Sequence, residues 1–253
     1  MNVTRLDISL RQYEIGLSGA IPDRDDWSEM AMDRGILEFV ALFSGIVFKY
    51  GGRIVHGCHP TFTPIILRQA RLQGGERTRK PVTLIMSDLW AQDMDSADIE
   101  SMTDVAEFVT TEKIGNGGVE DVYTRNKSLS AMRRVLIDAQ NVMVAVGGKL
   151  HSDDGKIPGV GEEMALAEEK GIPRFLVGGL GGFAQELAKD LTPSSLNNFL
   201  LQEESVALFG THDVSACVSI LFDHLARSEP LAQYIAQLLK QNPELGAPIL
   251  PSP

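Results

Sequence analysis

The segment NVMVAVGG (141–148) is followed, after a loop, by PGVGEEMALAEEKGIPRFLVGG (158–179), and together they give the clearest indication of the fold class. They contain an apolar run, an amphipathic run and a second apolar run, and Gly171 with Pro173 marks the end of the amphipathic run. A strand, a helix and a second strand in this order form the unit of a parallel sheet. We therefore predict strands at 141–148 and 174–179 around a helix at 161–171.

The same alternation extends toward the start of the chain. Short apolar runs predict further strands at 13–18, 53–57, 82–87 and 106–111. Longer amphipathic runs predict helices near 33–50, 63–73 and 127–139. After residue 183 only helical periodicity remains. The pattern predicts an α/β, Rossmann-like, doubly wound and mainly parallel sheet with helices on both faces and a helical C-terminal extension.

The domain organisation follows from where these patterns change. We predict a single domain over 1–253, in which the sheet core covers about 12–183 and the helical extension about 184–242. The remaining residues, 243–253, form a Pro-rich tail that we expect to fray.

Composition restricts the classes of partner. The 34 acidic and 23 basic side chains give a formal charge of −11, which opposes strong binding to nucleic acid or to an anionic membrane. The two cysteines, Cys58 and Cys217, form no CxxC pair, which is typical of a reducing compartment. No secretory leader and no apolar run of about 18 residues is visible. We therefore expect a cytoplasmic protein that does not associate with membranes.

Ligands of open α/β sheets bind outside the carboxyl ends of the strands, so the Gly-rich strand ends are the candidate site. The first is GLSGAIP (16–22), where Gly16, Ser18 and Gly19 could offer backbone N–H groups and a hydroxyl to a phosphate or ribose. An ordinary tight turn has the same composition. Neither the GxGxxG nor the GxxxxGK[ST] nucleotide motif occurs, which disfavours those two nucleotide-binding classes.

The second strand end is HGCHPTFTP (56–64), which carries Gly57, His59 and Thr61 ahead of a predicted helix. Thr61 or Thr63 could cap that helix, and the first helical amides could bind an anion. His56 and His59 also raise the alternative of a metal site. A third ligand at zinc spacing is lacking, so we predict no metal and no cofactor.

The third strand end contains Gly147, Gly148 and Lys149, and Lys149 could pair with a negative ligand. We interpret Asp153 and Asp154, which follow in the loop, as solvated loop residues.

Upstream, TRNKSLSAMRR (124–134) supplies Arg125, Lys127, Arg133 and Arg134, which form either a ligand-binding group or a solvated basic face. Successive helical residues diverge by about 100°, so only one of Arg133 and Arg134 is expected to face the sheet edge. We select Arg133 as the candidate ligand contact.

The turn at 158–161 raises a separate question, because Glu162 and Glu163 directly follow Gly159 and Gly161 at the predicted start of a helix, where a phosphate would bind. One glutamate could cap the helix, while the other, about 100° around the axis, faces the strand ends. There it could hold sugar hydroxyls or polarise a glycosidic bond. We therefore expect this turn to contact a sugar or base and phosphates to bind at the other strand ends.

The segments GLSG, GCHPTFTP, LSAMRR, AVGGK and PGVGEEMALAEEKGIPRFLVGG together resemble the SLOG superfamily, Rossmann-like proteins that include the LOG phosphoribohydrolases and the DprA proteins. The resemblance covers about 12–183, and the order of the segments is most similar to SLOG domains associated with sirtuin and TIR domains in bacterial defence systems. In the LOG enzymes, a PGGxGTxxE motif supplies a glutamate that acts on the N-glycosidic bond of a nucleotide. By this resemblance Glu163 is the catalytic candidate if the protein is an enzyme, while Val160 replaces the phosphate-binding threonine.

The resemblance implies a protein that binds a small nucleotide-derived ligand, such as an ADP-ribose or cyclic ADP-ribose signal in antiphage defence. The alternatives are a nucleotide N-glycosidase or glycosyl transferase that uses a carboxylate, and a structural, oligomerising partner protein. We expect a homo-oligomer, with any effector acting in trans because the chain has no sirtuin or TIR segment. The predicted ligand-binding residues are Gly16, Ser18, Gly19, Gly57, His59, Thr61, Arg133, Gly147, Gly148, Lys149, Gly159, Gly161, Glu162 and Glu163.

Overall fold

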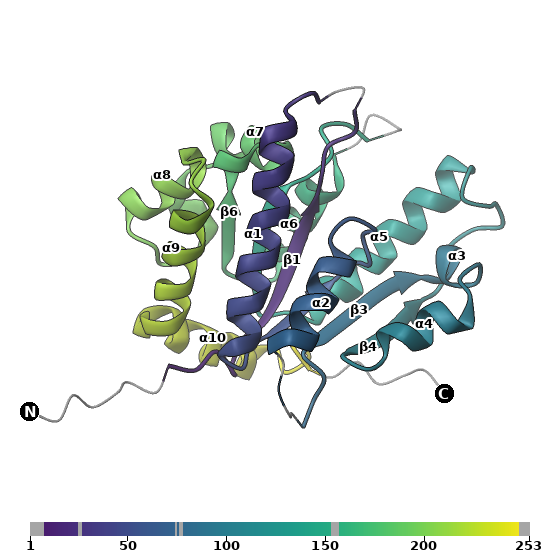
Figure 1. Ribbon diagram of the computed structural model, residues 1–253, viewed down its shortest axis with the longest axis horizontal. Coiled ribbons are helices and arrows are strands. Elements are labelled where there is room, and N and C mark those ends of the chain that lie inside the picture. Colours follow the sequence, from purple (N-terminus) through teal and green to yellow (C-terminus); the bar gives the residue numbers. More distant parts are fainter. Residues whose placement is uncertain (1–7, 25–26, 74, 76–77, 153–156, 248–253) are drawn as a thin grey trace, which may run out of the picture.

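A computed structural model of the protein describes residues 8–24, 27–73, 75, 78–152 and 157–247. Within them, six parallel strands form one sheet in the order β4-β3-β2-β1-β5-β6 (Figure 1). The strands are β1 (Glu14–Ala20), β2 (Arg53–His56), β3 (Val82–Ser87), β4 (Ala106–Thr111), β5 (Val142–Gly147) and β6 (Arg174–Val177). The strand order reverses between β1 and β5, which is the position where such sheets bind ligands.

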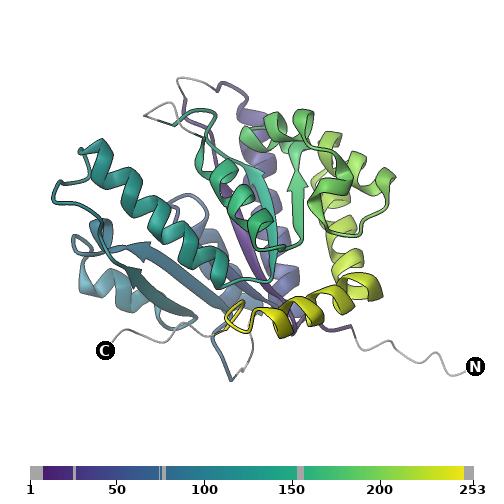
Figure 2. The same ribbon diagram turned by 180° about the vertical axis from the view of Figure 1, so that it is seen from behind.

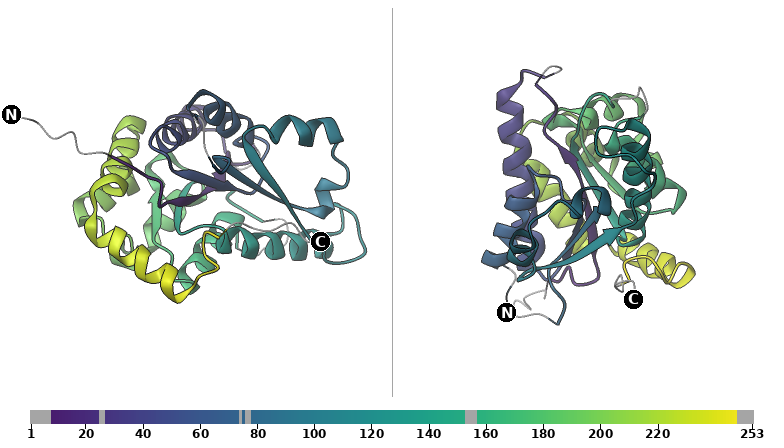
Figure 3. Two further views of the ribbon diagram at one scale, coloured as in Figure 1. Left: turned by 90° about the horizontal axis from the view of Figure 1, so that it is seen from below. Right: turned by 90° about the vertical axis from the view of Figure 1, so that its right-hand side faces the viewer.

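Helices cover both faces of this sheet (Figure 3). One face carries α1 (Met30–Lys49), α2 (Thr63–Gln73) and α9 (Val214–Arg227). The other carries α5 (Val122–Asp138), α6 (Gly159–Glu169) and α7 (Phe183–Asp190), which lie in front of the sheet in Figure 2. The predicted doubly wound α/β fold is therefore confirmed.

The remaining helices lie at the edges of the sheet. They are α3 (Asp88–Ala91), α4 (Ser96–Met102), α8 (Gln202–Gly210) and α10 (Glu229–Gln241), with the 3-10 turns η1 (Gly178–Leu180) and η2 (Pro193–Leu196). All described elements after β6 are helical, as predicted for the extension. Short α3, α4 and α8 were not predicted, because helices of one or two turns show little periodicity. In the part of the chain that the structure describes, no helix is long and apolar enough to cross a membrane.

The core consists of two apolar clusters, one on each face of the sheet. Along β5, Val142, Val144 and Val146 belong to the cluster under α1, whereas Met143 and Ala145 belong to the cluster under α5 and α6. A parallel strand that is buried on both faces reads as one continuous apolar run. This is why the sequence predicted β5 so clearly.

Part of the Pro-rich tail is packed against the fold. Leu245 is 3% exposed and belongs to the cluster under α5 and α6. The Gly246 N–H donates a hydrogen bond of 2.9 Å to the Asp138 carbonyl at the end of α5. Residues 243–247 are therefore held in place, while 248–253 lie outside the described residues.

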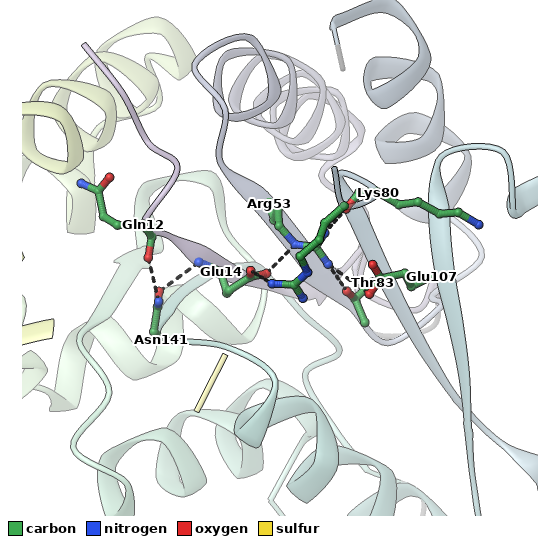
Figure 4. A network of polar contacts seen from close by, with 8 residues as sticks. Gln12, Glu14, Arg53, Lys80, Thr83, Glu107 and Asn141 are labelled. Carbon is green, nitrogen blue, oxygen red and sulfur yellow. Dashed lines mark hydrogen bonds and ion pairs between the residues drawn. The ribbon is translucent and has the colours of Figure 1, made fainter. Parts of the chain in front are cut away.

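A polar network joins four strands at their amino ends (Figure 4). The buried Arg53 guanidinium, from the first residue of β2, donates to Glu14 (2.8 Å), Thr83 (3.0 Å) and Glu107 (3.2 Å) and to the Lys80 carbonyl. Arg79 also pairs with Glu14, at 2.9 Å. Burial raises the pKa of Glu14, although Arg53 and Arg79 oppose this change. The network lies at the amino ends of the strands, whereas the candidate site lies at their carboxyl ends. It therefore supports the sheet without contacting the candidate site.

Candidate functional site

A cavity of about 720 Å³ lies at the carboxyl ends of the strands. Its walls come from residues 18–20 at the end of β1, residues 57–60 after β2 and residues 148–152 after β5, together with α5 and the first turns of α6. These segments surround the point where the strand order reverses. The cavity is therefore at the place where the doubly wound fold predicts a ligand.

Helix α5 contributes pairs of residues from successive turns to one side of the cavity. The pairs are Arg125 with Asn126, Leu129 with Ser130, and Met132 with Arg133. Such pairs recur on one helical face at intervals of three to four residues. Arg134 is exposed, so only Arg133 of the two adjacent arginines faces the cavity, as the helical spacing predicted.

The polar centre of the cavity is the Arg133 guanidinium. Its Nη1 donates to Glu162 Oε2 at 2.5 Å, and its Nε lies 3.6 Å from Glu163 Oε1, which is too long for a good hydrogen bond. A Cβ at position 159 would lie only 2.6 Å from Nη2 of this guanidinium. Gly159 is thus needed to let Arg133 lie across the start of α6.

Glu163 is held in a poorly solvated position, with only 14% of its side chain exposed. Burial raises the pKa of Glu163, and the negative charge of Glu162 adds to this effect. Arg133 and the nearby Ser18 hydroxyl lower the same pKa, but they do not outweigh burial. The carboxyl group is consequently easier to protonate than an ordinary glutamate.

Two buried donors beside this carboxyl group make no well-formed hydrogen bond with the described residues. Ser18 is 4% exposed, and its Oγ makes no hydrogen bond of normal geometry with the residues that the structure describes. The same holds for Arg133 Nε. Buried polar groups in native proteins are nearly always paired, so an unpaired hydroxyl and guanidinium N–H together favour a polar ligand at this point.

An ion pair lies at the rim of the cavity. Lys149 Nζ lies 3.0 Å from Asp23 Oδ2, and about half of each side chain is exposed. An exposed pair of this kind contributes little to stability, so a phosphate can compete with Asp23 for Lys149.

The two histidines of the second strand end are neutral near pH 7. Burial and the nearby Lys149 charge lower the pKa of His59, whose Nδ1 lies 2.9 Å from the Thr61 hydroxyl. Burial lowers the pKa of His56 to about 4, and its Nδ1 lies 2.8 Å from the Leu17 carbonyl. Among the described residues, no group of three or more His, Cys, Asp or Glu side chains is arranged to hold a metal ion. Because the pKa values of both histidines are lowered, neither histidine provides a positive charge for a phosphate near pH 7.

The structure brings ten of the fourteen predicted ligand-binding residues together in the cavity wall. They are Ser18, Gly19, Gly57, His59, Arg133, Gly148, Lys149, Gly159, Glu162 and Glu163. Contact of each with a ligand stays a prediction. Asp153 and Asp154 lie outside the described residues.

The other four predicted residues do not line the cavity. A Cβ on Gly16 would meet the buried Gln140 amide, and one on Gly147 would lie 2.4 Å from the Ala20 carbonyl oxygen. A Cβ on Gly161 would meet the side chains of Ile157 and Phe183. Thr61 contacts His59 through its hydroxyl but does not itself line the cavity. Gly16 and Gly147 therefore permit close packing of the protein chain and do not make room for a ligand.

The start of α6 differs from the prediction. The helix begins at Gly159, two residues earlier than expected, so Glu162 and Glu163 are its fourth and fifth residues. The first three amides of the helix, at residues 159–161, thus precede the carboxylates. Since a helix leaves its first amides without intrahelical partners, these three remain suited to a phosphate. The expectation that the two glutamates are the first helical residues is therefore wrong, although Glu162 still lies in the first turn.

Sequence reasoning missed one whole side of the cavity. Met86 at the end of β3, Trp90 in α3, and Asp93 and Met94 after it all line the cavity. The segment SDLWAQDM (87–94) contains no glycine, so a search for Gly-rich strand ends passes over it. Its position after a predicted strand was the available indication, because every strand of a parallel sheet ends at the same edge.

Substituting Gly159 by alanine is expected to push the Arg133 guanidinium away from Glu162 and Glu163. A flexible side-chain end can move at little cost, so we expect the free energy of unfolding to change by no more than about 1 kcal/mol. Ligand affinity should fall by about tenfold, because one charge-assisted hydrogen bond is lost. Denaturant unfolding and calorimetric titration with ADP-ribose measure the two effects.

Gly118→Ala, in the loop before α5 and outside the cavity wall, is the control. Equal affinity in Gly159→Ala and wild type would contradict a ligand role for Arg133.

Comparison with known proteins places these features in a family. The SLOG cluster2 family matches residues 81–233, which is more than half of the chain. The solved X-ray structure of TM1055, a Northeast Structural Genomics Consortium target, is similar with a TM-score of 0.49 and 15% identity, over 82% of this chain and 97% of that chain. No curated protein matches at a significant level. The chain belongs to the SLOG cluster2 family.

Proposed function

We propose that the protein binds a nucleotide of the ADP-ribose type in the cavity at the carboxyl ends of the strands, with a ribose against Glu163. The observation that carries this proposal is that two buried donors beside the Glu163 carboxyl group, Ser18 Oγ and Arg133 Nε, make no hydrogen bond of normal geometry with the described residues. Membership of the SLOG cluster2 family supports a Rossmann-like ligand site at the same edge of the sheet.

A ribose diol matches the chemistry of these three groups. A carboxylate accepts hydrogen bonds from sugar hydroxyls, a guanidinium donates to them, and the Ser18 hydroxyl can do either. The first two amides of α6, at residues 159 and 160, and Lys149 at the rim provide positions for phosphates. The cavity volume of about 720 Å³ is within the usual range of about 300–1,000 Å³ for small-molecule sites. The site therefore suits a nucleotide better than a single small metabolite.

The biological role that we propose is recognition of an ADP-ribose-derived signal in antiphage defence, through an effector in trans. Its support is the resemblance of the strand-end segments to SLOG domains that accompany sirtuin and TIR domains. We also propose that the protein is a homo-oligomer. Light scattering with and without ADP-ribose measures the assembly state and its dependence on the ligand, and a single monomeric mass under both conditions would contradict the oligomer.

A second candidate function is cleavage of an N-glycosidic bond, and the raised pKa of Glu163 favours it. A protonated Glu163 could transfer its proton to the base as the N-glycosidic bond breaks, and its carboxylate would then take a proton from the water that adds to the anomeric carbon of the ribose. We prefer binding without turnover because Val160 replaces the phosphate-binding threonine of the LOG motif.

One assay separates these functions. The purified protein is incubated with ADP-ribose, cyclic ADP-ribose, NAD and AMP, and both the melting temperature and the release of free base are measured. We expect a higher melting temperature with ADP-ribose and no released base, since a ligand that binds only the folded state stabilises it. Base release that disappears in Glu163→Gln would replace the binding function by the glycosidase. Unchanged melting temperatures with all four compounds would contradict both and favour a structural role.

A further inference from the structure

The cavity has a second end, whose chemistry differs from that around Glu163. Helix α5 extends along the cavity from Arg133 to Arg125, eight residues apart, which corresponds to about 12 Å. Figures 1 and 2 show α3 at the same side of the molecule as the first turns of α5. The second end is therefore formed where β3, α3 and the start of α5 converge.

An apolar wall lines this end. Its side chains are Met86, Trp90, Met94, Leu129 and Met132. Trp90 is partly exposed, and its indole N–H has no hydrogen-bond partner among the residues that the structure describes. Indole and thioether groups form the kind of surface on which the flat face of a nucleobase stacks, and such stacking contributes about 1–3 kcal/mol per base in nucleic-acid complexes.

One carboxylate stands next to this wall. The Asp93 N–H donates to the Trp90 carbonyl at 3.2 Å, so the two residues lie within one turn, and both line the cavity. The Asp93 carboxylate makes no hydrogen bond or ion pair with the residues described in the structure. A carboxylate only accepts hydrogen bonds, so it attracts an amino group and repels a carbonyl oxygen.

We infer that this second end is a nucleobase subsite that selects a 6-aminopurine, with Trp90 stacked on the ring and Asp93 accepting a hydrogen bond from the exocyclic amine. The inference rests on the proposed function and adds to it the residues that recognise the adenine base. With the base against Trp90, the length of the cavity along α5 brings the ribose and its phosphate toward Arg133 and Glu163. Adenine fits this arrangement, whereas the 6-oxo group of hypoxanthine or guanine would face the Asp93 carboxylate.

Calorimetric titration with AMP, IMP and GMP tests the selection. We expect wild-type protein to bind AMP about tenfold more tightly than IMP or GMP, because the latter two lose one charge-assisted hydrogen bond. In Asp93→Asn, whose amide both donates and accepts, the preference should fall to less than about threefold. Asp93 is exposed, so this variant is expected to fold normally. IMP or GMP binding as tightly as AMP, or an unchanged preference in Asp93→Asn, would overturn the inference.

Fluorescence provides a direct reading of the stacking contact. The chain has two tryptophans, and Trp27 lies outside the cavity wall with its indole N–H bonded to Asp33. In Trp27→Phe, AMP should quench the emission of Trp90, and ribose 5-phosphate should not. Absence of quenching by bound AMP would overturn the stacking role of Trp90.

The same titrations distinguish failure of the base subsite from failure of the proposed function. Nucleotides that bind with equal affinity whatever their base, with ribose 5-phosphate as tight as AMP, would overturn the base subsite and leave the proposed function standing. No binding of any nucleotide would overturn both.

Discussion

Substitution of Glu163 by glutamine is expected to weaken ADP-ribose binding by about 10- to 100-fold, because hydrogen bonds to a charged carboxylate are replaced by weaker ones. The same substitution is expected to raise the free energy of unfolding at pH 7 by about 0.5–2 kcal/mol, the usual size of a single stabilising substitution. The physical reason is that burial raises the pKa of Glu163, so its charged form is disfavoured in the folded protein. Opposite signs for affinity and stability are characteristic of a residue that is retained for binding.

The dependence of this gain on pH has a definite sign. A carboxyl group whose pKa is higher in the folded than in the unfolded protein binds more protons in the folded state between the two pKa values. Its contribution to the free energy of unfolding therefore decreases as the pH rises through that interval. The stability difference between Glu163→Gln and wild type should be small below the unfolded pKa of about 4.3 and should increase above it. Urea unfolding from pH 4 to pH 8 measures this difference.

Glu162→Gln is the matched control for that variant. Glu162 forms the 2.5 Å hydrogen bond with Arg133, so its neutralisation removes a favourable ion pair next to the guanidinium. We expect Glu162→Gln to lower the free energy of unfolding, opposite to Glu163→Gln. If Glu163→Gln also destabilised the protein at pH 7, Glu163 would be a structural partner of Arg133, which would contradict its retention for ligand binding.

Substitution of Arg53 by methionine is expected to lower the free energy of unfolding by about 3–5 kcal/mol, the cost of removing one partner of a buried ion pair. Arg53 is 6% exposed and binds Glu14, Thr83 and Glu107 at once. Without it, the only partner that the Glu14 carboxylate keeps among the described residues is Arg79, whose side chain is 35% exposed. Urea unfolding at pH 7 measures the loss.

Two further variants identify the cause of that loss. Arg71→Met removes an exposed pair with Asp104, at 2.7 Å, and should cost less than about 1 kcal/mol. Addition of Glu14→Gln to Arg53→Met should recover part of the stability, because it removes the unpaired charge. Ligand affinity should be unchanged in Arg53→Met, since the network lies at the opposite end of the strands. A cost as small as that of Arg71→Met would show that the network does not support the sheet.

Much of the fold could be predicted from the sequence because its main signals are local. Strands such as Val142–Gly147 are buried on both faces and read as unbroken apolar runs, and the long helices show clear periodicity. Helix starts were less accurate. Helix α5 begins at Val122 because the Asp121 side chain accepts a hydrogen bond from the Thr124 N–H, a cap that apolar periodicity does not reveal.

The site was only partly predictable, for two physical reasons. Glycine was taken as a sign of ligand approach, yet Gly16 and Gly147 make room for Gln140 and Ala20 of the chain itself. The Trp90 side of the cavity has no local signature, since its function depends on where β3 and α5 meet in space. The Arg133 contact with Glu162 joins residues 29 positions apart, and periodicity does not specify which partner an arginine takes.

A crystal structure of the protein with ADP-ribose tests most directly whether a ribose binds at Glu163. The account predicts that a ribose lies within about 3.2 Å of the Glu163 carboxylate and of Ser18 Oγ, with Arg133 Nε donating a hydrogen bond to the ligand. It also predicts that the adenine ring stacks on Trp90. A ligand bound outside this cavity, or inside it with Ser18 and Glu163 still uncontacted, would contradict the account.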